Sequence, residues 1–526
     1  MPSLNWIGKE AVVNHDKEVP FRLLKKVKSL SHSESSENLI IHGDNLEALK
    51  ALMPYYQNRV KCIYIDPPYN TGNEGWVYND KVNSPKIKKW LGKVVGGESE
   101  DLCRHDKWLC MMYPRLKLLR DLLSDDGTIF LSIDDNEHCN LRQALDEIFG
   151  EENFIANFIW KKRSGGGYTN TLVSTNHDYI ISFAKDITKV KFNDKIKNEF
   201  DIIKRYPLKD KKGYYKRRDL RKSGSADLKS DRPTMYYAVI APDKSKIYPT
   251  RPDGKDGRWA YGEKSFLELL NKEEVEFVKQ KEGWKVYTKE RPVDEEGNIK
   301  SEKYETIWLD VALNTNARSE LKDLFPEIEK TFETPKPINL IKHIIKISSS
   351  NGDIILDSFA GSGSTAQAVL DLNKEDNGSR KFILVEMEDY AKDITAERIN
   401  RAIKKEGYKD GFEYCELDKP LFNEEGQIEE ECTFEQLATY IYFTETNTNI
   451  DKKIISGSSI GEFNEIEYFL LFKEKGKNIL NKSFLKILHK KDRKKVVYAD
   501  KCMLDSKVLE RYNIQFKQIP YEVKVY

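Results

Sequence analysis

The stretch KCIYIDPPYNTG, Lys61 to Gly72, changes abruptly from apolar to polar and turn-forming residues. Cys62 to Ile65 form a short apolar run, which is followed by Asp66, Pro67, Pro68 and Tyr69. A run of this kind, closed by proline and glycine, predicts a buried parallel strand whose carboxyl end opens into a loop. In open α/β sheets, ligands bind at that end.

The four residues after the run carry groups that suit a flat ring bearing an exocyclic NH2. The carboxylate of Asp66 and the carbonyl of Pro67 can each accept one N–H bond, and Tyr69 can stack on the ring. The two prolines fix the backbone at their own positions. An ordinary turn, with a capping aspartate and a packed tyrosine, fits an isolated D-P-P-Y equally well. The rest of the chain must therefore decide between these two interpretations.

Length and composition limit what the chain can be. Its 526 residues predict about three domains. Lys and Arg total 87 against 86 Asp and Glu, so the net charge of +1 does not indicate what the chain binds. Only local clusters of charge can indicate a partner. Seven scattered cysteines without a CxxC pair favour free thiols in a reducing compartment over a disulfide framework or a metal site.

Neither a targeting signal nor a membrane span is predicted. The first residues, MPSLNWIGKE, lack a basic region followed by an apolar core. No apolar run approaches the roughly 20 residues that a membrane-spanning helix needs. We therefore expect a cytoplasmic protein without a membrane partner.

Strands and helices alternate through residues 38–185. Sequence periodicity predicts strands at 38–42, 62–65, 129–133, 154–160 and 179–184, and helices at 45–52, 107–123 and 137–149. This alternation is typical of a doubly wound α/β sheet. Asp44 precedes the first helix, where an aspartate is ordinarily an N-cap. Residues 72–97 show no clean period, and we expect a long loop over the pocket there.

A basic segment with interleaved aromatic residues follows at 204–222, KRYPLKDKKGYYKRRDLRK. A basic run is most often a solvated face. The aromatic residues favour a surface that neutralises phosphates and stacks on bases. The candidate nucleic-acid-binding residues in this segment are Tyr214, Tyr215, Arg217, Arg218, Arg221 and Lys222.

The α/β pattern resumes with a predicted helix at 332–347 and strands at 353–356 and 382–385. Between the two strands lies DSFAGSGST, 357–365, whose glycines let the backbone pass close to a ligand. This loop lacks the spacing of a phosphate cradle, and its first residue, Asp357, suits an amino group. Glu386 ends the next strand, where one carboxylate can accept from both hydroxyls of a ribose. S-adenosylmethionine, a nucleoside bearing an amino acid, fits this set.

Four motifs in one order resemble the amino-methyltransferases that act on adenine in DNA. They are DPPYNTG at 66–72, TPKPINLI at 334–341, LDSFAGSGST at 356–365 and ILVEM at 383–387. Their order is similar to that of the permuted beta class. HGDNLEAL at 42–49, GTIFLSIDDNE at 127–137 and QIPYEV at 518–523 resemble the modification (Mod) subunits of type III restriction-modification systems and their solitary relatives. The resemblance extends from about residue 38 to the end of the chain.

The resemblance implies a fold and a domain order. The fold would be a doubly wound, Rossmann-like methyltransferase sheet with a circularly permuted motif order, an inserted DNA-recognition domain and a C-terminal α+β region. The expected parts are an N-terminal arm (1–37), a catalytic half (38–185), a target-recognition insertion (186–330), a cofactor-binding half (331–410) and a C-terminal accessory domain (411–526).

The resemblance also implies a role for each motif residue. The target adenine would be held by Asp66, Pro67, Pro68 and Tyr69. S-adenosylmethionine would be bound by Asp44, Lys336, Asp357, Phe359, Gly361, Gly363 and Glu386. One departure is Ser364, where threonine is commoner in the family.

The implied activity is transfer of a methyl group from S-adenosylmethionine to N6 of an adenine flipped out of double-stranded DNA. The implied partners are that DNA, a restriction (Res) helicase-nuclease subunit and a second copy of the chain in a homodimer. One alternative is a specificity subunit that chiefly serves the helicase-nuclease partner. Another is methylation of cytosine N4 or of RNA, which Asp66 disfavours because cytosine enzymes of this group usually carry serine there.

Overall fold

The computed structural model contains two compact units, which are described separately. The larger comprises Met1–Asn193 and Glu305–Tyr526, and the smaller comprises Asp194–Tyr304. The structure describes residues 4–32, 36–71, 104–165, 172–195, 199–281, 283–293, 303–328, 332–423, 427–429, 431–450, 454–473, 477–488 and 493–519. The predicted loop at 72–97 lies outside these ranges.

A ten-stranded mixed sheet forms the centre of the larger unit. Its strands, in spatial order, are β1 (Arg22–Lys26), β16 (Glu413–Pro420), β2 (Leu39–His42), β15 (Lys381–Glu386), β14 (Ile354–Asp357), β3 (Val60–Ile65), β4 (Leu123–Ile133), β6 (His177–Ala184), β5 (Phe154–Lys161) and β13 (Ile307–Trp308). The strands from β16 to β4 run parallel, whereas β6 is antiparallel to both of its neighbours. The predicted α/β class is confirmed.

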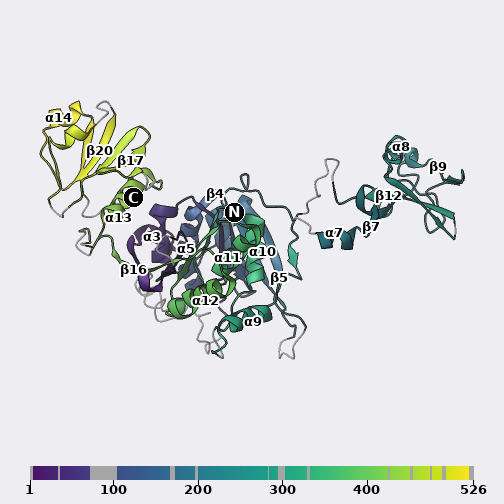
Figure 1. Cartoon of the computed structure of the whole chain (residues 1–526), viewed down its shortest axis with the longest axis horizontal. Helices are drawn as coiled ribbons and strands as arrows, with labels where there is room; N and C mark the ends of the chain where they lie inside the picture. The colour runs from purple at the N-terminus through teal and green to yellow at the C-terminus, as the bar shows by residue number, and fades with distance from the viewer. Residues whose placement is uncertain are drawn as a thin grey trace. The chain divides into compact units, whose positions relative to one another are not determined.

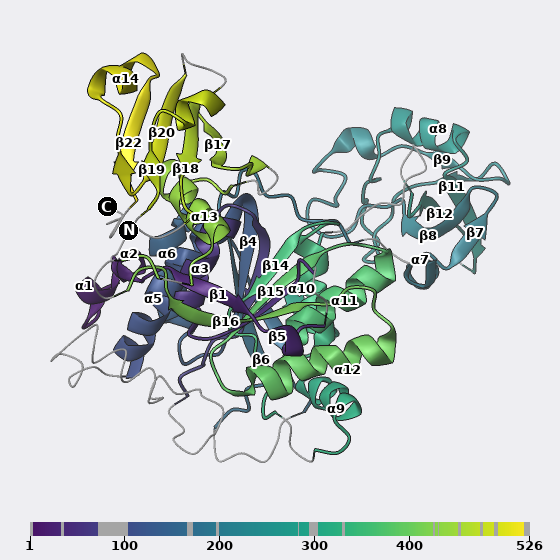
Figure 2. The same ribbon diagram turned by 60° about the vertical axis from the view of Figure 1, so that its left-hand side comes forward.

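Helices cover both faces of this sheet (Figure 2). One group is α3 (Asn45–Tyr56), α5 (Arg104–Leu122) and α6 (His138–Phe149), and the other is α10 (Ile338–Ser348), α11 (Ser364–Asp376) and α12 (Glu397–Glu406). Apolar side chains of the first group pack with those of the sheet in one continuous core. Because the central parallel strands are buried on both faces, they read as short apolar runs in the sequence. Pro114 lies inside α5.

The order of the strands brings distant parts of the chain together. β14 pairs with β3, with Ile355 opposite Cys62 and Leu356 opposite Ile63. Its other neighbour, β15, runs parallel to it. The carboxyl ends of β3, β14 and β15 therefore meet at one edge of the sheet, and those ends carry the D-P-P-Y motif, the glycine loop and Glu386.

Three segment boundaries differ from the sequence-based expectation. The predicted arm, 1–37, includes α1 (Lys9–Val12), α2 (His15–Glu18) and β1, and β1 forms the edge of the large sheet by pairing with β16. Residues 305–330 contain β13 and α9 (Asn314–Leu324), which belong to the larger unit. The helix predicted from Phe332 begins only at Ile338, because the preceding residue, Pro337, is extended.

The smaller unit is built on a four-stranded antiparallel sheet (Figure 1). Its elements are α7 (Glu199–Arg205), β7 (Leu208–Asp210), β8 (Gly213–Asp219), β9 (Val239–Ile240), β10 (Lys246–Ile247), α8 (Glu263–Asn271), β11 (Val275–Gln280) and β12 (Gly283–Glu290). Leu220, Trp259 and Phe266 contribute to a small apolar core of its own.

The C-terminal part of the chain forms a second α+β assembly (Figure 1). It consists of α13 (Phe434–Thr446), β17 (Ser459–Phe463), β18 (Ile466–Leu470), β19 (Ile479–Leu480), β20 (Lys494–Ala499), β21 (Lys501–Cys502), α14 (Ser506–Arg511) and β22 (Ile514–Gln518). Four of these strands form one sheet, in the order β17, β18, β20, β22. Within the ranges that the structure describes, no helix is long and apolar enough to cross a membrane.

Candidate active site

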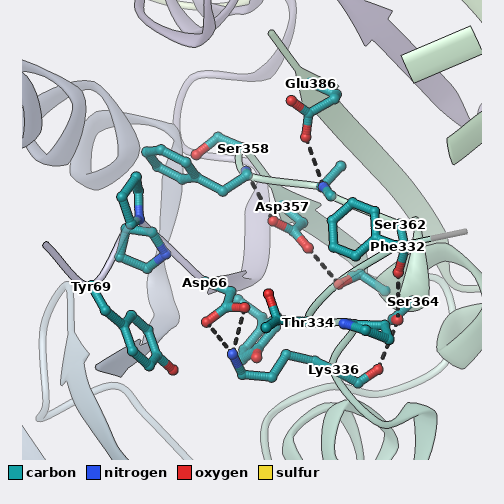
Figure 3. Close-up of a pocket in the computed structure, with 18 of the residues that line it drawn as sticks. Asp66, Tyr69, Phe332, Thr334, Lys336, Asp357, Ser358, Ser362, Ser364 and Glu386 are labelled. Carbon is teal, nitrogen blue, oxygen red and sulfur yellow. Dashed lines mark hydrogen bonds and ion pairs between the residues drawn. The ribbon is translucent and has the colours of Figure 1, made fainter. Parts of the chain in front are cut away.

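A cavity of about 320 Å³ lies at the carboxyl edge of the large sheet (Figure 3). Its lining includes Asp66, Pro67, Pro68, Tyr69, Lys336, Asp357, Phe359, Gly361 and Glu386. Residues from two motifs almost 300 positions apart thus share one space. This is possible because β3 and β14 are neighbours in the sheet.

Asp66 follows β3 directly, and its carboxylate faces a lysine from the opposite wall of the cavity. The Lys336 Nζ lies 2.6 Å from each carboxylate oxygen of Asp66. The same ammonium lies 4.8 Å from the ring centroid of Tyr69. Burial raises the pKa of Asp66, and Lys336 opposes that rise. The predicted contact of Lys336 with a cofactor stays a prediction.

Asp357, at the end of β14, is almost completely buried. Its carboxylate accepts hydrogen bonds from the Thr365 hydroxyl at 2.5 Å and from the Phe359 N–H at 3.0 Å. Burial raises the pKa of Asp357 to about 7, although these bonds favour the charged form. The side chain can therefore change its ionisation near neutral pH.

The glycine loop turns tightly between β14 and α11. Gly361 and Gly363 have φ angles of 51° and 80°, in the left-handed region that glycine adopts without strain. A Cβ on Gly363 would lie 3.1 Å from the carbonyl oxygen of Thr395. The loop therefore needs glycine at 363 both for its conformation and for its close approach to the neighbouring segment.

Glu386 holds this loop from the end of β15. Its carboxylate accepts from the N–H of Gly361 at 2.7 Å and from the N–H of Glu388 at 2.9 Å. Burial raises the pKa of Glu386 to about 7. The Tyr390 hydroxyl also hydrogen-bonds to this carboxylate. A carboxylate at the end of this strand can still accept from a ribose hydroxyl.

Asp44 and Gly363 stand apart from the other predicted cofactor residues, because neither is among the described residues that line the cavity. The Asp44 carboxylate caps α3 by accepting from the N–H groups of Leu46 and Glu47. It also lies 3.3 Å from the guanidinium of Arg115. The ordinary N-cap role is thus present, and a cofactor contact stays a prediction.

The structure adds lining residues to which the sequence analysis assigns no role. Asp134 follows β4, a position that the strand pattern alone could have singled out. Asp178 lies near the start of β6 and bonds to Lys162 at 2.6 Å. It reaches this edge because β6 is antiparallel, which the sequence does not reveal. Phe332, also missed, was expected to lie in a helix.

Two buried groups brace the D-P-P-Y turn from behind. The indole N–H of Trp108 donates to the Pro68 carbonyl at 2.7 Å. Asn70 is in the left-handed region, with φ of 55°, and its amide donates to the buried carboxylate of Glu137. His105 contacts the same carboxylate at 2.7 Å. The turn is therefore held at both Pro68 and Asn70.

The predicted DNA-binding residues all belong to the smaller unit, on β8 and directly after it: Tyr214, Tyr215, Arg217, Arg218, Arg221 and Lys222. Arg217 pairs with Glu276 at 2.5 Å, and the Tyr215 hydroxyl donates to the same carboxylate at 3.1 Å. Tyr215 is buried, whereas Arg218 is exposed. Part of the predicted basic surface is thus neutralised inside the unit.

Comparison with known proteins agrees with this geometry. A family model described as DNA methylase matches residues 60–397, which include the D-P-P-Y turn, the glycine loop and Glu386. This chain belongs to that DNA methylase family. The match also includes the smaller unit.

The relatives of this chain include the EcoPI Mod subunit of a type III restriction-modification enzyme from Escherichia phage P1, which is 34% identical over 74% of this chain and 64% of the relative. The EcoP15I Mod subunit from Escherichia coli is 32% identical over 77% of this chain and 70% of the relative. The type II methyltransferase M.KpnI from Klebsiella pneumoniae is 32% identical over 69% of this chain and 84% of the relative. The chain spans less than two thirds of the length of the phage relative.

Proposed function

We propose that this DNA methylase transfers a methyl group from S-adenosylmethionine to N6 of an adenine in double-stranded DNA. The observation that carries the proposal is the shared cavity, in which the D-P-P-Y turn lies beside the glycine loop and Glu386. The turn offers acceptors for an amino group. The loop and Glu386 offer a site for a nucleoside bearing an amino acid.

The cofactor would be held on the β14 and β15 side of the cavity. The Glu386 carboxylate would accept from the ribose hydroxyls, and Asp357 would accept from the methionine ammonium. Phe359 and Gly361 would line the methionine part. When bound, this cofactor supplies an electrophilic sulfonium methyl group.

The target base would occupy the β3 side of the cavity. A stacked base cannot reach this position, so the adenine must be flipped out of the duplex, and stacking on Tyr69 would offset part of the cost. The Asp66 carboxylate and the Pro67 carbonyl would accept the two N–H bonds of the amino group. These bonds draw the nitrogen lone pair back from the ring, and a charge-assisted bond of this kind contributes about 1.5 to 3 kcal/mol. Alignment of the nitrogen with the methyl group then contributes most to the rate.

Two of the relatives are named as Mod subunits of type III restriction-modification enzymes. We infer that this chain likewise works beside a restriction (Res) subunit with helicase-nuclease activity, and that it forms a homodimer. Copurification with a Res subunit encoded by a neighbouring gene, followed by light scattering, tests both inferences. A monomer that does not copurify with a Res subunit would contradict both inferences and indicate a solitary methyltransferase.

Sequencing of modified bases in DNA from cells that express the protein tests the activity itself. We expect N6-methyladenine at one short sequence, absent from cells that express Asp66→Ala. N4-methylcytosine at that sequence would instead support the second candidate activity of this family. Unmodified DNA in both strains would contradict the proposal.

A further inference from the structure

A lysine from a different part of the chain reaches the carboxylate that would receive the target amino group. The Lys336 Nζ lies 2.6 Å from both oxygens of Asp66, a two-point contact that fixes the orientation of the carboxylate. The ammonium also lies over the ring of Tyr69, 4.8 Å from its centroid. One cation therefore contacts both side chains that would hold the base (Figure 3).

The lysine is itself held in place from the cofactor side of the cavity. The Ser364 hydroxyl, in the first turn of α11, donates to the Lys336 carbonyl at 2.8 Å. The buried guanidinium of Arg398 donates to that hydroxyl at 2.7 Å. Pro337, directly after the lysine, has a φ of −65°, the value that the proline ring imposes. The backbone of Lys336 is thus fixed, and only its side chain spans the distance to Asp66.

In the described part of the chain, the other ionisable groups that interact with Asp66 do not supply a counter-charge. The carboxylate of Asp178, on β6, raises the pKa of Asp66. Asp66 in turn raises the pKa of Asp357, on β14, so these two carboxylates repel its negative charge. The nearby cation Lys162 bonds to Asp178 at 2.6 Å, so its charge is matched there. Among the residues that the structure describes, the hydroxyls of Tyr64 and Tyr69, on β3 and the following turn, also interact with Asp66.

We propose that Lys336 is the positioning residue of the target pocket, whose ammonium keeps Asp66 as an oriented, ionised acceptor for the amino group of the target base. This inference rests on the proposed function. The family resemblance implies that Lys336 contacts the cofactor, whereas in this proposal Lys336 acts on Asp66, the residue that would bind the target base.

The reaction explains why the state of Asp66 matters. The N6–CH3 bond forms as the S–CH3 bond breaks, and the sulfonium becomes a neutral thioether. The nitrogen then carries a positive charge until one N–H proton leaves to Asp66 or to water. An ionised Asp66 accepts the N–H bond throughout, whereas a protonated Asp66 presents an O–H donor and loses part of its acceptor capacity. Burial favours the protonated form, and Lys336 works against that tendency.

The test compares pH profiles of methyl transfer for the wild type, Lys336→Met, Lys336→Gln and Lys336→Arg. Without the ammonium, the pKa of Asp66 should rise, because Lys336 no longer stabilises the carboxylate. The acid limb of the kcat profile should therefore move to higher pH. A shift of about one pH unit corresponds to a roughly tenfold loss of kcat on that limb, and the loss should shrink at alkaline pH. Lys336→Arg keeps the charge and should restore most of the profile.

Two further measurements separate this role from a structural or cofactor role. Lys342→Met, on α10, removes a lysine that pairs with Glu375 and should leave the profile unchanged. The dissociation constant for S-adenosylmethionine, measured by calorimetry, should change less than about threefold in Lys336→Met, well under the tenfold that corresponds to 1.4 kcal/mol.

Several outcomes would overturn the inference. Folded Lys336→Met and Lys336→Gln enzymes whose pH profiles match the wild type would contradict it. Weakened cofactor binding with an unchanged profile would assign Lys336 to the cofactor instead. A wild-type protein that methylates no DNA base at any pH would contradict the proposed function, and that result is distinguishable because it does not depend on a Lys336 variant.

Discussion

The indole N–H of Trp108 donates to the carbonyl oxygen of Pro68 at 2.7 Å, from a fully buried position on α5. This bond occupies the carbonyl next to that of Pro67. The Pro67 carbonyl is the one that would accept from the target amino group. Trp108 thus secures the turn without competing for that acceptor.

Trp108→Phe should loosen the turn. The substitution removes the N–H and leaves the half-buried Pro68 carbonyl without this donor, which costs about 1 kcal/mol of folding free energy. We expect kcat to fall while affinity for S-adenosylmethionine is retained. Trp160→Phe is the matched control. Trp160, on β5, is equally buried, and its indole N–H donates to the Ala312 carbonyl at 2.8 Å. Equal losses of kcat in the two variants would argue against a specific role for Trp108.

Stability should depend on pH through the buried carboxylates. Burial raises the pKa of Asp357 and of Glu386 to about 7 in the folded protein, against about 4 in the unfolded chain. The folded state then holds protons that the unfolded state has released. The free energy of unfolding should therefore fall as pH rises from about 4 to about 7 and level off above that. In Glu386→Gln, denaturant unfolding should show a smaller fall, and an identical pH dependence would contradict the assignment.

Cofactor binding should show the opposite pH dependence. The ribose hydroxyls donate, so they need Glu386 as a carboxylate, and the methionine ammonium likewise needs Asp357 ionised. Affinity for S-adenosylmethionine should therefore rise as pH increases through about 7, where both groups lose their protons. Calorimetric titration at several pH values measures this effect. A pH-independent dissociation constant would show that these two carboxylates do not bind the cofactor.

The smaller unit should contact DNA through the exposed part of β8. Arg218→Glu should weaken DNA binding and lower the slope of log K against log salt, since a cation that contacts phosphate releases about one counterion. Lys264→Glu on α8 changes the net charge equally and serves as the control. Equal weakening in the two variants would attribute the effect to the overall field of the unit. An unchanged slope in Arg218→Glu would indicate that β8 is an ordinary solvated face that does not contact DNA.

The sequence predicted the central part of the sheet well, because buried parallel strands read as short apolar runs and the motif residues follow them directly. The position of Asp66 after β3 and of Glu386 at the end of β15 follow from this pattern. Adjacency of β3 and β14 does not follow from local sequence, because their pairing joins segments almost 300 residues apart.

Two features of the site could not be predicted from the sequence. The pair formed by Lys336 and Asp66 spans 270 positions, and the motif around Lys336 predicted a continuous helix rather than an extended entry to α10. Asp178 lines the cavity only because β6 runs against its neighbours. In both cases the decisive contact depends on tertiary arrangement and leaves no local pattern.

The most direct measurement is transfer of an isotopically labelled methyl group from S-adenosylmethionine to duplex DNA by the purified protein, followed by mass spectrometry of the nucleosides. Wild-type protein should yield labelled N6-methyladenine. Asp66→Ala should yield none while retaining DNA and cofactor binding, because the acceptor for the amino group is gone. Wild-type-like methylation by Asp66→Ala would contradict the assignment of Asp66, and label on a different base would contradict the proposed reaction.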